Sequence, residues 1–377
     1  MSKPDGASDA SSHFLPSSKD TCTHSLFRDQ FVQDQRGDSG LDEDQTTLDQ
    51  IVQLRAQYDL PAGGHTLSVG SETQLEWLEG ARLDPPRIDR QRFAFYLQDE
   101  WVPTRAPMIS LLPGVRVDVD TYFDAWITPR IALMVRPTEK FDARVSYGRS
   151  YRAPAFKEMF LAFDNLGAGY IVRGNPELVP EDAWGTTLDL SYRPADWVQI
   201  SGSAFETRIT NAIVADTVVE ASPGEPTQFG YVNVGNARTH GAELRAQFEV
   251  LRWAELGGSY QALDARDVDE DRPLPGRARH SGTVDLTFHH RHPRFGTTIR
   301  VRGAAFGERV FFRDLDGDGD TDRDLSPAFM TLDLRAAQAL FEFVEVFVGV
   351  DNVLDAGDAT TNPLVPRAYY GGISAHY

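Results

Sequence analysis

Short segments throughout the chain alternate apolar and polar residues, which is the pattern of β-strands with two different faces. In residues 242–250, one face carries Ala242, Leu244, Ala246, Phe248 and Val250. The other face carries Glu243, Arg245, Gln247 and Glu249. Because successive side chains of a strand point to opposite sides, each segment has one apolar wall and one charged wall. The apolar wall faces a core in a soluble sandwich, whereas in an outer-membrane barrel it faces lipid and the charged wall faces a wet lumen.

The pattern predicts about sixteen strands, each bounded by clusters of Gly, Pro, Asp or Asn. They are expected near residues 24–35, 46–59, 65–74, 91–102, 108–119, 126–136, 140–151, 184–193, 197–214, 240–251, 253–264, 280–290, 296–312, 329–340, 342–353 and 368–377.

The connections between these strands alternate in length. Short connections are expected at 137–139, at 193–196 and near Arg252. Long connections are expected at 152–183, 215–239, 265–279, 313–327 and 354–367. Tight turns at one end and long loops at the other are typical of outer-membrane barrels. We therefore predict an all-β, antiparallel, up-and-down transmembrane barrel over residues 21–377, preceded by a polar, disordered segment at 1–20.

Composition excludes several other classes of protein. No apolar run approaches the roughly 20 residues of a transmembrane helix, which excludes a helical membrane protein. The formal net charge of -19 argues against nucleic-acid binding, which depends on Lys and Arg. Cys22 is the single cysteine, so no disulfide framework is expected. The sequence lacks the motifs of the common catalytic centres, and we predict that the chain is not an enzyme.

Four motifs, in order along the chain, resemble those of TonB-dependent outer-membrane receptors. They are FYLQDEW at 95–101, YRAPAFKEMF with GNPELVPE at 151–181, YVNVGNA leading to GAEL at 231–244, and VDNVLD at 350–355. The resemblance covers about residues 90–377.

The resemblance implies a receptor in the outer membrane of a Gram-negative bacterium. Such receptors take up a scarce ligand such as an iron-siderophore, cobalamin or haem, and have about 22 strands around an N-terminal plug. A TonB energy-coupling complex pulls on that plug. In this sequence we recognise no plug, no energy-coupling box and no secretory signal in residues 1–20. The resemblance thus predicts the C-terminal part of such a barrel, with about 16 of its 22 strands.

Two other functions are compatible with the residues. A plugless, porin-like passive channel is favoured by the even number of strands and the charged lumen wall. A soluble β-rich binding protein is favoured only by the missing signal.

The longest expected loop carries a group of aromatic and basic residues. The candidates are Phe156, Phe160, Phe163, Tyr170 and Arg173. They can contact a ligand, because aromatic residues on a long exposed loop often do. They can equally form the loop's own small core.

An acidic loop is the candidate metal site. Its ligands would be Asp314, Asp316, Asp318, Asp320 and Asp322, with Gly319 at the sixth position of a calcium loop. Leu325 stands at the twelfth position, where a bidentate Glu is expected. The pattern favours a weak extracellular Ca²⁺ site or contact with metal-bridged lipopolysaccharide. The alternative is a solvated acidic loop tip.

The last strand carries Tyr369, Gly371, Ile373, Ala375 and Tyr377 on one face. The resemblance implies that this strand, with Tyr369, Ile373 and Tyr377, is recognised by the barrel-assembly machinery, and an edge strand suits pairing with a partner strand. The alternative is an ordinary closing strand with an interfacial aromatic residue.

A histidine cluster lies at an expected periplasmic turn. His289, His290 and His292 have suitable ligand chemistry for a metal. The neighbouring Pro293 and arginines favour a polar turn instead.

Overall fold

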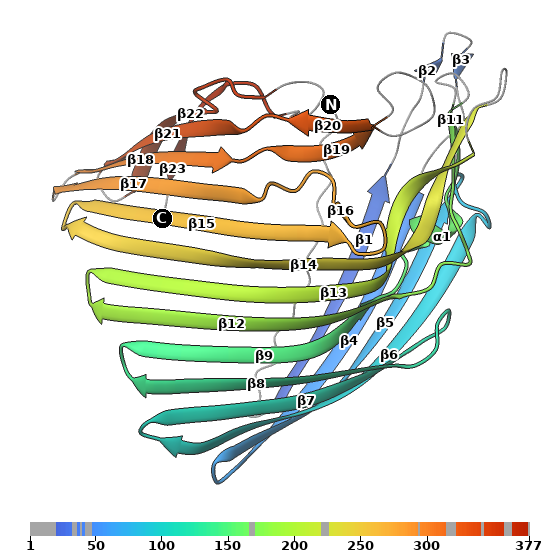
Figure 1. The fold of residues 1–377 in the computed structure, drawn as a ribbon, viewed down its shortest axis with the longest axis horizontal. Coiled ribbons are helices and arrows are strands. Elements are labelled where there is room, and N and C mark those ends of the chain that lie inside the picture. The colour runs from blue at the N-terminus through green and yellow to red at the C-terminus, as the bar shows by residue number, and fades with distance from the viewer. Residues whose placement is uncertain are drawn as a thin grey trace.

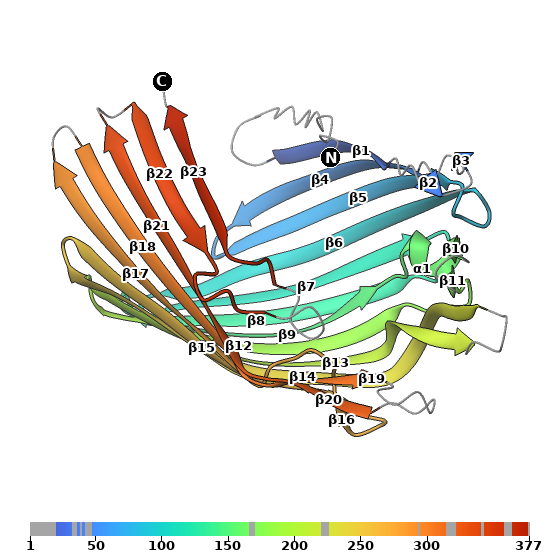
Figure 2. The same ribbon diagram turned by 90° about the horizontal axis from the view of Figure 1, so that it is seen from above.

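The computed structural model describes residues 20–31, 36–37, 40–41, 47–165, 170–219, 226–292, 295–313, 322–340, 343–357 and 364–375. Within these residues, sixteen strands form one antiparallel ladder that curls around a shared interior (Figure 1, Figure 2). Each strand of the ladder pairs with the strands next to it in this order: β1 (Asp20–Phe31), β4 (Thr47–Ala62), β5 (His65–Gly80), β6 (Arg87–Arg105), β7 (Met108–Asp120), β8 (Trp126–Thr138), β9 (Phe141–Arg152), β12 (Glu181–Ala195), β13 (Val198–Val219), β14 (Thr227–Leu251), β15 (Ala254–Asp267), β17 (His280–His292), β18 (Phe295–Phe306), β21 (Phe329–Leu340), β22 (Val344–Asp351) and β23 (Ala368–Ala375). Each of the sixteen predicted segments overlaps one of these strands.

The connections alternate in length as predicted. Short turns at 63–64, 106–107, 139–140, 196–197 and 252–253 join strands at one end of the barrel. In Figure 1 the turns that follow β8, β12 and β14 lie on the left, while the long connections gather on the right. By the general rule for outer-membrane barrels, the turn end is periplasmic and the loop end is extracellular.

The two faces of the sheet differ as a lipid-facing and a lumen-facing wall should. On β6, Phe93, Phe95 and Leu97 point outward, and the side chain of Phe95 is 64% exposed. On the inner face of the same strand, Ala94 is 3% exposed. An apolar outer face of this size is stable only in lipid. The described residues contain no helix that is long and apolar enough to cross a membrane.

The loop end contains more regular structure than the sequence predicted. The loop expected at 152–183 holds α1 (Phe156–Phe160), β10 (Ala162–Asn165) and β11 (Tyr170–Arg173). The other long loops hold β16 (Arg272–Pro273), β19 (Arg309–Arg313) and β20 (Asp322–Ser326). A short hairpin of β2 (Arg36–Gly37) and β3 (Gly40–Leu41) follows β1.

The loop predicted at 215–239 is wrong. β13 continues to Val219 and β14 begins at Thr227, so most of this segment is a long hairpin. Beyond the membrane both faces of a strand can be wet, so the apolar–polar alternation that marks a spanning strand is lost there. The strand predicted at 296–312 is likewise two strands, because β18 ends at Phe306 and β19 begins at Arg309. The N-terminal segment 1–19 lies outside the described residues.

Candidate functional site at the loop end of the barrel

The longest connection, residues 153–180, packs against the inner faces of strands at the barrel mouth. Its apolar side chains join a buried cluster formed by Leu78, Leu83, Ile88, Phe156, Met159 and Leu178. Leu78 lies on the same face of β5 as the lumenal residues Glu72 and Glu76, so the cluster forms on the inner side of the wall. Burying one such side chain contributes about 1.5–3 kcal/mol. The connection is therefore a packed element at the mouth, and Figure 2 shows its α1 and β11 at the loop end.

A buried ion pair links this connection to two strands. Arg90 on β6 donates from Nε to Oδ2 of Asp120 on β7 at 2.7 Å, and its Nη1 donates to the carbonyl of Pro154 at 2.9 Å. The side chains of Arg90 and Asp120 are only 4% and 1% exposed. One guanidinium thus fixes β6, β7 and the start of the connection. Removing one partner of such a pair typically costs about 3–5 kcal/mol, because the other charge stays buried.

A second arginine closes the two ends of the connection. Arg152, at the end of β9, contacts Glu181 at 2.6 Å and Glu158 at 3.0 Å. Glu158 accepts a hydrogen bond from the backbone N–H of Ala155, which completes the first turn of α1. Glu181 also accepts one from the backbone N–H of Ile213 on β13 at 2.7 Å. Residues at both ends of one motif are therefore held by a single cation.

The GNPELVPE and YVNVGNA motifs bind each other directly. Asn175 donates from Nδ2 to the carbonyl of Tyr231 at 3.0 Å. The amide of Asn233 accepts a hydrogen bond from Val179 N–H and donates one to the Val179 carbonyl, each at 2.9 Å. This pairing ties the connection to β14, on the wall opposite to β6 and β7.

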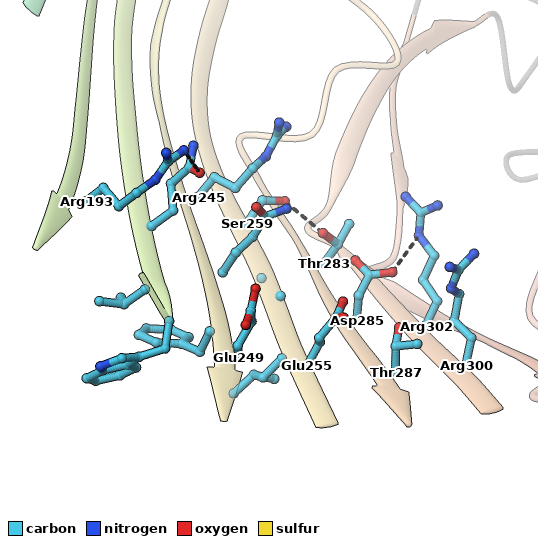
Figure 3. Close-up of a pocket in the computed structure, with 18 of the residues that line it drawn as sticks. Arg193, Arg245, Glu249, Glu255, Ser259, Thr283, Asp285, Thr287, Arg300 and Arg302 are labelled. Atoms are coloured by element: carbon cyan, nitrogen blue, oxygen red, sulfur yellow. Dashed lines mark hydrogen bonds and ion pairs between the residues drawn. The ribbon is translucent and has the colours of Figure 1, made fainter. Parts of the chain in front are cut away.

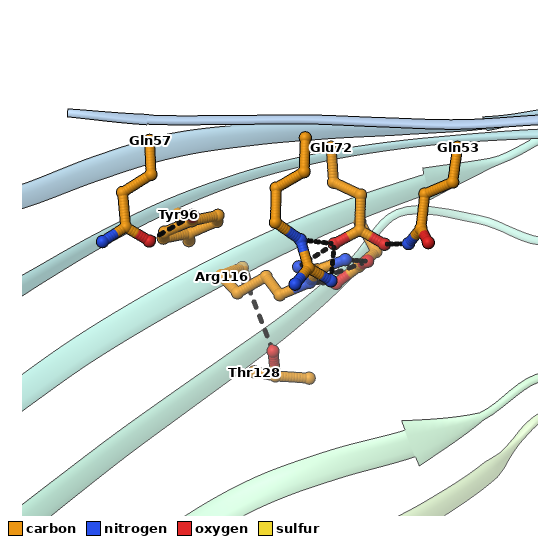
Figure 4. Close-up of polar contacts among 8 residues, drawn as sticks. Gln53, Gln57, Glu72, Tyr96, Arg116 and Thr128 are labelled. Atoms are coloured by element: carbon orange, nitrogen blue, oxygen red, sulfur yellow. Dashed lines mark hydrogen bonds and ion pairs between the residues drawn. The ribbon is translucent and has the colours of Figure 1, made fainter. Parts of the chain in front are cut away.

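One lumen wall, formed by β4 to β8, carries charges that are paired with one another (Figure 4). Glu72 accepts hydrogen bonds from Gln53 at 2.5 Å, from Arg55 at 3.0 Å and from Arg116 at 3.2 Å. Arg116 also contacts Asp118 at 2.8 Å. We call this region the paired wall, and its polar groups satisfy each other without an external partner.

The wall from β12 to β18 is hollowed toward the turn end (Figure 3). The hollow has a volume of about 930 Å³ and is lined mainly by polar side chains. Arg302 lies 3.7 Å from Asp285, which is a loose ion pair. The side chains of Arg300 and Glu249 have no hydrogen bond or ion pair with any described residue, although their backbones are hydrogen-bonded in the sheet. We call this region the open wall.

Residues 7–353 match the family described as TonB dependent receptor-like, beta-barrel. The chain belongs to this family. The match confirms the resemblance seen in the four motifs and places the protein among the β-barrels of the Gram-negative outer membrane. The family consists of transport receptors and not of enzymes, which confirms the prediction that the chain is not an enzyme.

Curated relatives and solved structures agree with this family. The chain is 24% identical over 309 residues to the iron-regulated outer membrane virulence protein of Vibrio cholerae, covering 78% of this chain and 46% of that protein. It is 26% identical over 265 residues to the vitamin B12 transporter BtuB of Vibrio vulnificus, covering 70% and 38%. The ferric enterobactin receptor PfeA of Pseudomonas aeruginosa shares the fold, with a TM-score of 0.76, 17% identity, and coverage of 94% of this chain and 59% of that one. This TonB-dependent receptor barrel spans about half the length of the curated relatives it matches.

Two further motif residues of the receptor barrel shape its loops. Asn236 donates to the carboxylate of Asp269 from its backbone N–H at 2.6 Å and from Nδ2 at 3.1 Å. A Cβ on Gly235 would lie 1.5 Å from Oδ2 of Asp269, so a side chain at this position would displace that carboxylate from Asn236. The hydrogen bonds from Asn236 hold the pKa of the Asp269 carboxyl below its ordinary value.

Asn352, in the last motif, organises the final loop. Its φ of 50° lies in the left-handed region, which Asn tolerates better than most residues. Its Nδ2 donates to the carbonyls of Ala356 at 2.7 Å and Val365 at 3.1 Å, and its Oδ1 accepts from the N–H of Ala356. This side chain therefore joins both ends of the loop between β22 and β23.

The five residues predicted to bind ligand separate into two groups. Phe156 is 4% exposed in the buried cluster, and Phe160 packs against that cluster. These two residues form the loop's own core, which was the alternative reading of the sequence. Phe163 and Tyr170 lie elsewhere, with ring centroids 6.1 Å apart, and Arg173 forms an ion pair with Asp164. Ligand contact by this second group stays a prediction.

Sequence reasoning missed two residues of that second group. The ring of Phe229 on β14 is 6.0 Å from that of Tyr170, and the Arg82 guanidinium lies 4.1 Å above the Phe163 ring. The Nε and Nη2 atoms of Arg82 are buried without a hydrogen-bond partner in the described part of the chain. Both residues are distant from 163–170 in sequence, so no local pattern could have placed them there.

The acidic loop is largely outside the described residues. Asp314, Asp316, Asp318 and Asp320 fall there, and Asp322 is an exposed residue at the start of β20. Among the residues that the structure describes, no three His, Cys, Asp or Glu side chains are grouped to hold a metal ion. The Ca²⁺ site stays a prediction.

The last strand, β23, runs from the loop end to the turn end, and the histidine cluster lies at the turn end. Tyr369 and Ile373 of β23 are 74% and 75% exposed on its outer face, and Tyr377 lies outside the described residues. Recognition of this strand by the assembly machinery stays a prediction. His289 contacts Glu255 at 3.3 Å, while the ring of His292 stacks on Phe295 at 4.2 Å. These contacts agree with the reading of the cluster as a polar turn.

Proposed function

We propose that the chain is the barrel of an outer-membrane receptor for energy-dependent uptake of a scarce ligand, such as an iron-siderophore, cobalamin or haem. The observation that carries this proposal is the packed connection 153–180, which is fixed across the inner side of the mouth by Arg90 and by the buried cluster. A mouth that is narrowed by an ordered element selects what enters it. A general diffusion pore needs no such binding surface.

The aromatic group beside this connection is the candidate ligand surface. Phe163, Tyr170 and Phe229 form consecutive ring contacts, and Arg82 lies over the first of them. The unpartnered nitrogens of Arg82 favour a ligand that brings oxygen acceptors. An aromatic, oxygen-rich ligand would use both the rings and the guanidinium.

Energy coupling would act through a plug seated in the lumen. The unpaired side chains of Arg300 and Glu249 on the open wall support such an occupant, because charged groups without internal partners bind water or a polar polypeptide. The partner on the periplasmic side would then be the TonB energy-coupling complex, as the family implies.

A porin-like passive channel is the second candidate. The observation that favours it is the hollow of about 930 Å³ on the open wall, together with an even ladder of strands. Such a channel would pass small solutes without energy and without saturation.

The deciding experiment expresses the chain behind a working secretory signal in cells that lack their own receptors of this family. Binding of ferric siderophore, haem and cobalamin to whole cells is measured, alongside the rate at which small sugars enter proteoliposomes. We expect saturable binding of one ligand that weakens at least tenfold in Phe163→Ala. The matched control Phe93→Ala, on the lipid-facing side of β6, should bind normally. Unsaturable sugar entry with no ligand binding would overturn the receptor proposal in favour of the channel.

A further inference from the structure

The outer face of β12 to β17 changes from apolar to basic at the loop end, and the strand register shows where. Residues that face each other across neighbouring strands form a rung of the sheet. Four successive rungs on the outer face are apolar apart from one histidine: Val198–Phe248–Leu256–Leu286, Ile200–Ala246–Gly258–Val284, Gly202–Leu244–Tyr260–Gly282 and Ala204–Ala242–Ala262–His280. These rungs form the wall that contacts lipid.

The next two outward-facing rungs are polar and then basic. The first consists of Thr186, Glu206, His240 and Asp264. The second consists of Arg149, Trp184, Arg208, Arg238 and Arg266. Arginine therefore occupies four of five positions in one row across β9 to β15.

The height of this row matches the headgroup layer of a membrane. From Val250 to Ala242 the apolar face spans eight residues, or roughly 27 Å along the strand and about 20 Å along the membrane normal at the usual tilt. Arg238 lies four residues further on, about 10 Å higher by the same geometry. Arginine side chains also reach back toward the interface with their apolar stems.

The carboxylates of the lower rung orient the arginines without covering them. Glu206 contacts Arg208 at 2.7 Å and Arg238 at 3.1 Å. Asp264 contacts Arg266 at 3.1 Å and lies 3.8 Å from Arg279. The four arginine side chains remain 69%, 45%, 40% and 62% exposed, in the order named. Arg266 also contacts Asp271 at 3.1 Å. Each guanidinium carries five N–H donors, so most donors remain available even on Arg266.

A hollow of about 460 Å³ lies where the basic row meets the apolar face. Its polar side chains come from His240, Asp264, Arg266, Arg279 and His280, and its floor includes Ala242 and Ala262. A second hollow, of about 290 Å³, shares Arg279 and His280 and adds Arg277 and Arg323. Cations therefore stand beside an apolar floor. We call Arg208, Arg238, Arg266, Arg279, His240 and His280 together the basic boundary.

The turn end of the same strands differs. There the outer face ends in aromatic residues, with Trp197 and Trp253 58% and 53% exposed. Tryptophan is typical of both membrane interfaces, and Trp184 in the basic row is another example, so the row of arginines and not the aromatic residues distinguishes the loop end. The two leaflets of the outer membrane would thus meet chemically different borders.

We propose that the basic boundary binds the phosphate groups of lipopolysaccharide in the outer leaflet. Arginine pairs phosphate through two parallel hydrogen bonds, and the acyl chains of the same lipid cover the apolar rungs below. Free phosphate would use the arginines alone and gain nothing from the apolar floor. The proposal does not depend on which ligand the receptor transports.

The test uses the full chain, assembled in nanodiscs of zwitterionic phospholipid, and fluorescent lipopolysaccharide as the probe. The double variant R238Q/R266Q should weaken binding at least tenfold. The matched control R300Q/R302Q removes the same charge from the lumen side of β18 and should bind like the unmodified chain. R238K/R266K keeps the charge but loses the planar fork, so it should bind with intermediate affinity.

Two further measurements identify the chemical group that is bound. Dephosphorylated lipopolysaccharide should bind as weakly as the double variant binds the intact lipid, and inorganic phosphate should compete poorly. Heat-dependent gel mobility confirms that each variant has assembled. Equal binding of the intact lipid by R238Q/R266Q and the unmodified chain would overturn the proposal, as would equal binding of the dephosphorylated lipid.

Discussion

The two lumen walls of the barrel differ in how their charged side chains are paired. On the paired wall, Glu72 accepts from three donors on two strands besides its own. On the open wall, the side chains of Glu249 and Arg300 have no hydrogen-bond or ion-pair partner within the described part of the chain. A charge that is paired inside the protein stabilises the barrel by itself. An unpaired charge stabilises only a molecule that binds to it. The paired wall therefore has a structural role, whereas the open wall is suited to docking.

The largest effect is expected at the upper end of the paired wall. Arg90→Ala leaves Asp120 buried without its cation, and we expect a loss of about 3–5 kcal/mol of stability. The same change frees the carbonyl of Pro154, so residues 153–180 should become accessible to protease. Limited proteolysis in mild detergent measures this. If the connection stays protected, the hydrophobic cluster and the contacts of Arg152, Asn175 and Asn233 hold it in place without Arg90.

A matched pair of substitutions compares the walls directly. Glu72→Gln removes the negative charge shared by Arg55 and Arg116 and replaces one of the two acceptor oxygens by an NH2 donor, and should cost about 1–3 kcal/mol. Glu249→Gln removes a charge of the same type from the open wall and should change stability by less than about 0.5 kcal/mol. The midpoint of unfolding in urea, followed by tryptophan fluorescence, gives both values. Equal losses would remove the distinction between the walls.

The arginines of the open wall should strengthen the binding of a plug domain in the lumen. The double variant R300Q/R302Q should leave the urea midpoint nearly unchanged, but it should weaken association with an added plug domain from a related receptor. Pull-down at low and high salt measures this, and the binding that depends on the arginines should fall with ionic strength. Association that is insensitive both to the variant and to salt would show that the plug does not use this wall.

The smallest effect concerns the loop after β15, which lies outside both walls. Asn236 lowers the pKa of Asp269 in the folded chain, so the ionised carboxylate stabilises the loop at pH values above the ordinary Asp pKa of about 3.9. This contribution is lost as the pH falls through the lowered folded pKa. Hydrogen exchange of residues near 236 and 268 should therefore accelerate in that acidic range. Gly235→Ala displaces the carboxylate and should give fast exchange at every pH; unchanged exchange on acidification would show that Asp269 is not needed.

The sequence predicted the membrane-crossing part well, for a physical reason. Lipid on one side and water on the other impose a period of two on every spanning strand, and this period is visible in residues such as Leu244 and Arg245. Above the membrane this constraint ends. The continuation of β13 to Val219 and the start of β14 at Thr227 therefore carry no such signature, and the sequence predicts a loop there.

The candidate site at the barrel mouth was harder to predict from the sequence, because its contacts depend on the register between neighbouring strands. Arg90 and Asp120 are thirty residues apart and each resembles an ordinary lumenal charge. Only the pairing of β6 with β7 places them together out of water. Phe156 was difficult to place for a different reason. An aromatic residue on a long loop is compatible with both exposure and burial, so its sequence position alone does not decide between them.

The strictly sequential pairing of the ladder has an evolutionary consequence. Every strand from β4 onward pairs with the next spanning strand along the chain, often across a turn of only two residues, such as 252–253. A duplication or deletion of one hairpin would therefore preserve the pairing of all the others, apart from the single junction where it occurs. Folds with crossover connections lack this tolerance, because removing one element breaks several partnerships. Barrels built in this manner can change their circumference in steps of two strands while the remaining wall keeps its register.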